Sequence, residues 1–104
     1  MNFSNLMRAE LESAEGLEVV VSLVEIPPET RLPVHTHPGE EFAYVIEGSL
    51  VLWQEGKDDI RVTAGEAERV PLAQVHTTFT EKEPAKILVF RVHKQGEPER
   101  ILVE

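Results

Sequence analysis

The chain has 104 residues, of which 41% are hydrophobic and 28% are charged, proportions that fit one globular domain. Its net charge of −9 repels the phosphate backbone of nucleic acids, and no basic stretch offsets it, so DNA and RNA are not expected partners. The absence of cysteine excludes disulfides, thiolate nucleophiles and zinc sites built from thiolates.

The first half of the chain alternates apolar and polar residues between proline and glycine breaks, a pattern that predicts short β-strands. Pro27 and Pro28 end the first strongly β-prone segment, because proline cannot donate a hydrogen bond to a sheet. Glu47-Gly48 is typical of a two-residue hairpin turn. The predicted strands of this half are residues 6–11, for which a helical turn is an equal alternative, 18–26, 41–46 and 49–54.

The second half continues this pattern to the end of the chain. Its predicted strands are residues 60–63, 67–70, 75–80 and 85–93, followed by a short apolar tail at residues 101–103. Strands of this length and spacing indicate an all-β sandwich or barrel. The exposed sheet edges that such a fold can leave are a hazard that dimerisation removes, so we expect a homodimer.

No segment of the sequence is typical of a membrane protein. The first five residues lack the basic region and the apolar core of a signal peptide. The longest apolar run, residues 19–24, is interrupted by Ser22 and is far too short to cross a bilayer. We therefore expect a cytoplasmic protein that has no membrane partner.

Two histidines one residue apart carry the clearest chemical signal in the chain. His35 and His37 project from one face of an extended segment, because side chains alternate with period two. The turn at Pro38-Gly39 brings a carboxylate near them, and imidazole with carboxylate is a typical ligand set for divalent transition metals. A further ligand would come from one of the two remaining histidines, His76 or His93.

The carboxylate of this site is either Glu40 or Glu41, and periodicity does not decide between them. Glu40 shares its parity with Phe42, Tyr44 and Ile46, which look like the face directed to the core. Glu41 shares its parity with smaller side chains, which would leave room for a cavity. The pattern alone therefore leans toward Glu40.

The spacing of these residues resembles the two motifs of the cupin family. His35-x-His37-x3-Glu41-x6-Gly48 is similar to the first motif, and Gly65-x5-Pro71-x4-His76 is similar to most of the second. The 16 residues between Gly48 and Gly65 are close to the shortest spacing found in small bacterial members. The resemblance covers about residues 29–80.

This resemblance implies an all-β fold, the double-stranded β-helix or jelly-roll barrel, with residues 1–104 as a single cupin domain. The metal ligands that it implies are His35, His37, Glu41 and His76. Such a set suits iron, manganese, nickel, zinc, cobalt or copper and disfavours calcium and magnesium. His93 lies outside both motifs and is expected at the surface, and Phe79 and Phe90 are expected in the core.

Three positions depart from the family motifs without removing a ligand. Glu29 and Ala73 stand where cupins often have turn-forming glycines, and Thr80 stands where the second motif usually ends in asparagine. Thr80 and Thr78 share the parity of His76, which makes both candidates for small polar groups in the cavity.

The predicted hairpin has a consequence for the site, because directly opposed residues of a hairpin share a face. It places Gln54 opposite Glu41, which makes Gln54 a candidate hydrogen-bond partner for that carboxylate. A polar strand end that faces water is an equally good interpretation of Gln54.

The resemblance implies more than one function, because the cupin fold hosts many chemistries. The first hypothesis is a metal-dependent oxygenase that acts on a small organic substrate. The second is a non-catalytic module that binds a small ligand or a metal. Isomerase or lyase activity is a further alternative, and the sequence does not identify a catalytic residue.

Overall fold

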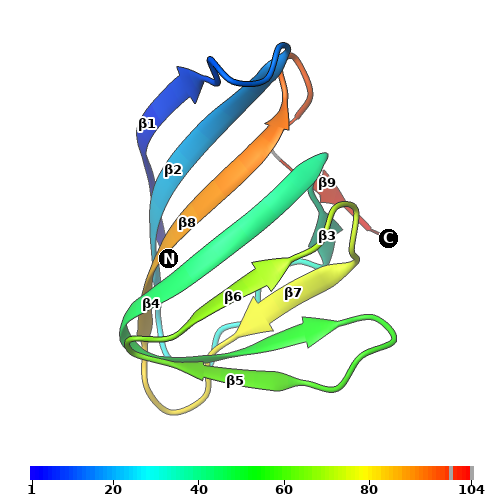
Figure 1. The fold of residues 1–104 in the computed structure, drawn as a ribbon. Helices are drawn as coiled ribbons and strands as arrows, with labels where there is room; N and C mark the ends of the chain where they lie inside the picture. The colour runs from blue at the N-terminus through cyan, green and yellow to red at the C-terminus, as the bar shows by residue number, and fades with distance from the viewer. Residues whose placement is uncertain (99, 104) are drawn as a thin grey trace.

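The computed structural model describes residues 1–98 and 100–103, which form nine β-strands and no helix (Figure 1). The strands are β1 (Asn2–Glu10), β2 (Leu17–Ile26), β3 (His35–Thr36), β4 (Gly39–Gln54), β5 (Ile60–Thr63), β6 (Ala67–Val70), β7 (His76–Phe79), β8 (Ala85–Lys94) and β9 (Ile101–Leu102). The all-β prediction is confirmed, and the predicted strands at residues 60–63 and 67–70 coincide with β5 and β6.

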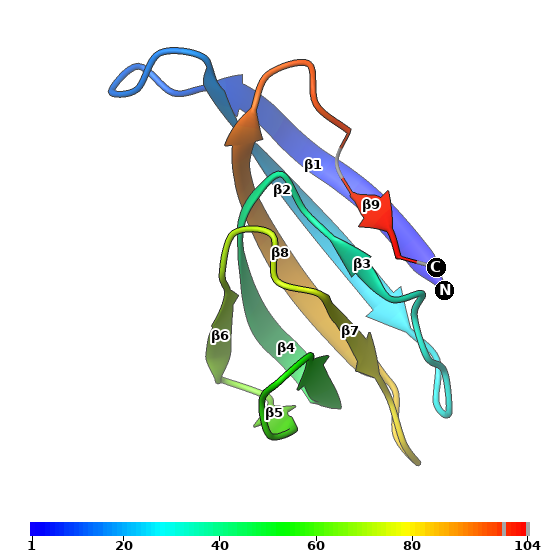
Figure 2. The same ribbon diagram turned by 90° about the vertical axis from the view of Figure 1, so that its right-hand side faces the viewer.

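The strands make two antiparallel sheets that share β4. Sheet A consists of β1, β2, β8, the first half of β4, and β6. Sheet B consists of the second half of β4 with β5, β7, β3 and β9. Figures 1 and 2 show the short strands β3, β7 and β9 forming a wall opposite the long strands β1, β2 and β8. The interior between these walls holds the candidate site.

The predicted hairpin at Glu47-Gly48 is wrong, because β4 runs through these residues as one strand of 16 residues. Ile46 is an extra residue in the pairing with β8, which makes a β-bulge, and Gly48 follows it with a φ of 77°. A bulge bends a strand instead of reversing it, and glycine tolerates the positive φ. A Cβ on Gly48 would also collide with the carbonyl oxygen of Pro84. The bend therefore carries β4 from one sheet to the other.

The bulge also shifts the side-chain alternation by one residue. Ala43 and Val45 point inward before it, and Leu50 and Leu52 point inward after it. The inward residues of both halves join the buried core, to which sheet A adds Ile87 and its neighbours on β8.

Three expectations from the sequence about side chains of sheet A are wrong. Two of them fail because the outer face of this sheet is also apolar. Phe42, Tyr44 and Ile46, whose parity Glu40 shares, are 39%, 44% and 39% exposed and point away from the core. Phe90, predicted in the core, pairs with Phe42 on this face and is 42% exposed. His93, predicted at the surface, is buried because it shares the inward parity of β8.

Strands lie close to both ends of the described chain. β1 pairs with β2 along residues 2–10, so the predicted strand at residues 6–11 is confirmed over residues 6–10 and the helical alternative is wrong. The apolar tail forms β9, which pairs with β3 next to the histidines. Among residues 1–98 and 100–103, no helix is long and apolar enough to cross a membrane.

The two departures from the glycine positions of the motifs leave a mark on the backbone. Glu29 and Ala73 have φ values of 51° and 59°, in the left-handed region that glycine adopts without penalty. Both are exposed turn residues, so the turns keep the shape that glycine would allow. The side chains at these positions therefore impose local strain.

Candidate metal centre

Strand pairing brings the three motif histidines together at one end of the interior. In the ladder between β3 and β7, His35 lies directly opposite His76, so their side chains share the inward face. His37 follows two residues after His35 and keeps the same parity. The ring centroids are 4.3 Å apart for His35 and His76, 4.8 Å for His35 and His37, and 5.1 Å for His37 and His76. All three imidazoles are buried.

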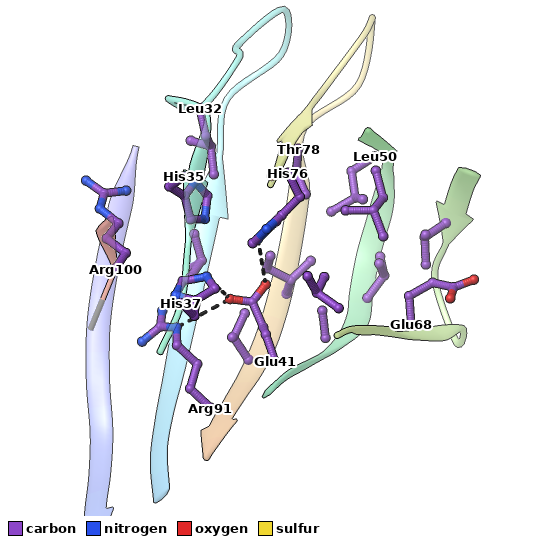
Figure 3. A pocket seen from close by; sticks show the side chains of 18 of the residues that line it. Leu32, His35, His37, Glu41, Leu50, Glu68, His76, Thr78, Arg91 and Arg100 are labelled. Atoms are coloured by element: carbon purple, nitrogen blue, oxygen red, sulfur yellow. Dashed lines mark hydrogen bonds and ion pairs between the residues drawn. The ribbon is translucent and has the colours of Figure 1, made fainter. Parts of the chain in front are cut away.

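Glu41 enters this cluster from the first half of β4. Its Oε2 lies 2.6 Å from Nε2 of His37, and its Oε1 lies 3.8 Å from Nε2 of His76 (Figure 3). One donor atom from each of the four residues His35, His37, Glu41 and His76 lies within 4.8 Å of the other three. Glu40 instead faces solvent, where it pairs with Arg69 at 3.9 Å. The structure therefore places Glu41 beside the histidines, whereas the periodicity alone favoured Glu40.

Backbone carbonyls orient two of the imidazoles. Nδ1 of His35 lies 2.6 Å from the carbonyl oxygen of Pro33, and Nδ1 of His76 lies 2.8 Å from that of Gln74. A protonated Nδ1 donates to each carbonyl, which leaves the lone pair on Nε2. Nε2 of His76 is shielded from solvent and has no hydrogen-bond partner in the described chain. A buried acceptor of this kind is satisfied by a metal ion.

The protonation states of the cluster also fit metal binding. Burial is the largest cause that lowers the pKa of His35, to about 4, so its imidazole is neutral at physiological pH. Burial alone would raise the pKa of Glu41, but the adjacent imidazoles of His37 and His76 outweigh this effect and hold the pKa well below its usual range. A neutral imidazole, as at His35, and an ionised carboxylate, as at Glu41, are the forms that bind metals. These four residues could hold a metal ion.

The cluster opens onto a cavity of about 270 Å³ between the two sheets. Most of its lining is apolar, and Val45, Leu50, Val62 and Ile87 are examples from three strands. This volume lies just under the roughly 300–1,000 Å³ of sites for drug-sized ligands. The cavity therefore suits a small ligand with an apolar part.

The remaining candidate residues take different positions. Thr78 lines the cavity, but the hydroxyl of Thr80 donates to the carbonyl of Pro27 at 2.5 Å and anchors a turn instead. Gln54 is buried, but it lies opposite His76 and not Glu41, because the hairpin on which its placement rested does not exist. No hydrogen bond joins Gln54 to Glu41 among the described residues, and Oε1 of Gln54 has no partner there.

Sequence reasoning missed one charged residue of this site, Arg91. It lies opposite Glu41 in the ladder between β4 and β8, with its Nε 3.4 Å from Oε2 of that carboxylate. The signal was available in the alternation of β8, where Arg91 and His93 continue the inward parity of Ile87 and Val89. His93 is not part of the cluster, since it contacts Glu18 at 2.8 Å.

Comparison with known proteins places this geometry in a family. The DMSP lyase DddQ from Ruegeria pomeroyi DSS-3 is 26% identical with a TM-score of 0.75, over 82% of this chain and 43% of that one. The polyketide cyclase RemF from Streptomyces resistomycificus is 22% identical with a TM-score of 0.71, over 94% and 80%. An oxalate oxidase is 25% identical with a TM-score of 0.67, over 85% and 46%.

The chain thus spans less than half the length of the DMSP lyase and of the oxalate oxidase. No curated protein matches it in sequence. A cupin-like protein from Thermotoga maritima shares the fold at 18% identity and a TM-score of 0.70, over 97% of this chain and 74% of that one. The family model described as the cupin domain matches residues 22–91. The chain therefore belongs to the cupin family and has its jelly-roll fold.

Proposed function

We propose that this cupin binds a divalent transition metal through His35, His37, Glu41 and His76 and is a metal-dependent oxygenase for a small organic substrate. The observation that carries the proposal is the meeting of four buried donors at the wall of a mostly apolar cavity. Iron, manganese, nickel, zinc, cobalt and copper are the ions that accept this donor set. Four protein ligands leave positions for other ligands on a six-coordinate ion.

The protein's own residues have defined tasks in such a site. The carbonyls of Pro33 and Gln74 hold two imidazoles so that Nε2 points inward. Arg91 and His37 contact the Glu41 carboxylate and hold it in place. The apolar walls exclude water and orient the apolar part of a substrate. A bound metal would supply Lewis acidity and, for a redox-active ion, electrons for reaction with dioxygen.

Metal content tests the first half of this proposal. Protein purified without added metal is analysed by elemental analysis beside the variants His76→Gln and His93→Gln. Both histidines are buried to the same degree, but only His76 belongs to the cluster, so His93→Gln is a matched control for the loss of a buried imidazole. We expect stoichiometric metal in the wild type and in His93→Gln, and little in His76→Gln. Equal metal content in all three proteins would contradict the site.

A lyase is the second candidate, favoured by the likeness to the DMSP lyase at 26% identity. Oxygen uptake by the iron-loaded protein with a panel of small organic substrates separates the two reactions. An oxygenase consumes dioxygen in step with product and stops under anaerobic conditions, whereas a lyase gives the same rate without oxygen. A metal-loaded protein that binds ligands but turns none over would instead be the non-catalytic module.

We further propose that the protein is a homodimer that buries the outer face of sheet A. Phe42, Tyr44, Ile46 and Phe90 form a contiguous apolar patch there, each 39–44% exposed. Patches of this kind mark interaction surfaces in soluble proteins, and a self-complementary patch suits a two-fold dimer. Light scattering should show a dimer for the wild type and for Leu72→Glu, an exposed apolar residue outside the sheets. Phe42→Glu should be monomeric, and a monomeric wild type would end this proposal.

A further inference from the structure

Arg91 is a buried cation directed into the cavity. It is 5% exposed, although arginine is seldom buried to this degree unless it is paired. Its position on β8 places it on the inward face, opposite Glu41, and its side chain lines the cavity (Figure 3). The guanidinium also lies over the ring of Phe3 on β1, with Cζ 5.2 Å from the ring centroid.

The pairing with Glu41 uses only part of the hydrogen-bond donors of the guanidinium. Its Nε faces Oε2 of Glu41 at 3.4 Å, a long distance for a hydrogen bond between charged groups. Its Nη1 is shielded from solvent and has no hydrogen-bond partner among the described residues. Arginine carries five N–H donors, and a buried donor without an acceptor is costly. The contact with Glu41 therefore does not satisfy all the hydrogen-bond donors of Arg91.

The balance of charge points to the missing acceptor. With a divalent ion at the four ligands, the buried centre would carry two charges from the metal, one opposite charge from Glu41 and one charge from Arg91, a net excess of two positive charges. Such an excess is unfavourable away from water unless an anion offsets it. Glu68 also lines the cavity, but Figure 3 shows it across the cavity from Arg91. Arg100 adds another cation to the lining.

We propose that Arg91 binds the carboxylate of a small organic acid in this cavity. The planar guanidinium matches a carboxylate with two parallel hydrogen bonds, and the apolar walls suit a short hydrocarbon remainder. The substrate class is then a short carboxylic acid anchored by Arg91 next to the metal ligands. This assignment of a substrate rests on the proposed function, whereas the anion site itself depends only on Arg91 and the cavity.

Calorimetry with butanoate and butanamide tests this site, because the two probes have similar shape and differ in charge. Each is titrated into zinc-loaded and metal-free wild type, Arg91→Lys, Arg91→Met and Arg69→Met. Arg69 is exposed, so its variant controls for the loss of a surface cation at the same net charge. We expect the wild type and Arg69→Met to prefer butanoate by about 10- to 100-fold, the range for hydrogen bonds to a charged group.

Arg91→Lys should keep part of this preference, because lysine retains the charge without the fork, and Arg91→Met should lose it. The proposal is supported if the wild type in either form prefers butanoate and the preference falls in both Arg91 variants. It is overturned if neither form prefers butanoate, or if the preference survives in Arg91→Lys and Arg91→Met unchanged, which would assign the anion to the metal. If Arg91→Met does not fold, Arg91→Lys and the probe pair still decide.

Metal content is measured on the same samples, so the two proposals fail in different ways. A wild type that holds no metal but prefers butanoate through Arg91 refutes the metal-dependent function alone. A wild type that holds stoichiometric metal and does not distinguish the probes refutes the anion site alone.

Discussion

We predict that the negative charge of Glu41 contributes strongly to the stability of the metal-free protein. Glu41 is 9% exposed, and its carboxylate lies 3.4 Å from Nε of Arg91 and 2.6 Å from Nε2 of His37. In Glu41→Gln the shape is kept, but the guanidinium of Arg91 stays buried and loses the carboxylate that it faces. At this separation and an effective dielectric constant of about 20, the Coulomb energy of the pair is about 5 kcal/mol.

Loss of one partner of a buried pair costs roughly 3–5 kcal/mol in proteins, so we expect Glu41→Gln to lower the free energy of unfolding by this amount. That is a large share of the roughly 5–15 kcal/mol that stabilises a domain. Arg91→Met should cost less, because Glu41 then keeps its contacts with His37 and His76. The double variant Glu41→Gln/Arg91→Met should be more stable than Glu41→Gln alone, because it no longer buries an unpaired charge.

Urea denaturation of the metal-free proteins, followed by circular dichroism, measures all four members of this double-mutant cycle. A coupling energy of at least about 1 kcal/mol would support the pairing. Two results would refute the reasoning: a loss below about 1 kcal/mol in Glu41→Gln, or strictly additive losses in the double variant.

Three further predictions concern other parts of the molecule. Glu29→Gly and Ala73→Gly should each stabilise the protein by about 0.5–1 kcal/mol in thermal melts, since relief of the left-handed φ exceeds the entropy cost of glycine; a lower melting temperature in both would contradict the strain. Between pH 6.5 and 4 the unfolded chain binds a proton at His35 that the folded chain does not, so metal-free stability should fall by about 3 kcal/mol as the pH is lowered. The variant His35→Gln should lack this part of the pH dependence, and an unchanged profile would refute the assignment. His93→Leu should destabilise the protein by about 1–3 kcal/mol without changing its metal content, because the Glu18 carboxylate loses its buried partner; loss of metal would show that this histidine also serves the cluster.

The sequence was sufficient for the strand content and for the residues that meet at the site. Period-two patterning and breaks at proline and glycine located β5 and β6 to the residue, because these strands are short and bounded by turns. The motif spacing singled out His35, His37, Glu41 and His76, and the structure brings their side chains together. Local patterns carry this information because they record turns and strands that form within a few residues.

Local patterns could not decide whether the chain reverses or continues at a turn. They also could not decide which side chains of a strand point into the core. The same Glu47-Gly48 pair can close a hairpin or bend a continuous strand, and the pairing of β4 with β8, β5 and β7 selects the bend. Alternation separates the two faces of a strand but does not say which is buried when both are apolar, as in the stretch from Phe42 to Ile46.

The face that is buried is set by the sheet that packs against it. For that reason the periodicity alone leaned toward Glu40, and the sequence reasoning placed Phe90 inside and His93 outside and overlooked Arg91. All four residues lie on β4 and β8. The sequence by itself determined an all-β chain with one ligand set at fixed spacing. Only the tertiary structure decided which faces of β4 and β8 are buried and that a buried arginine stands beside Glu41, because both depend on contacts between strands far apart in the chain.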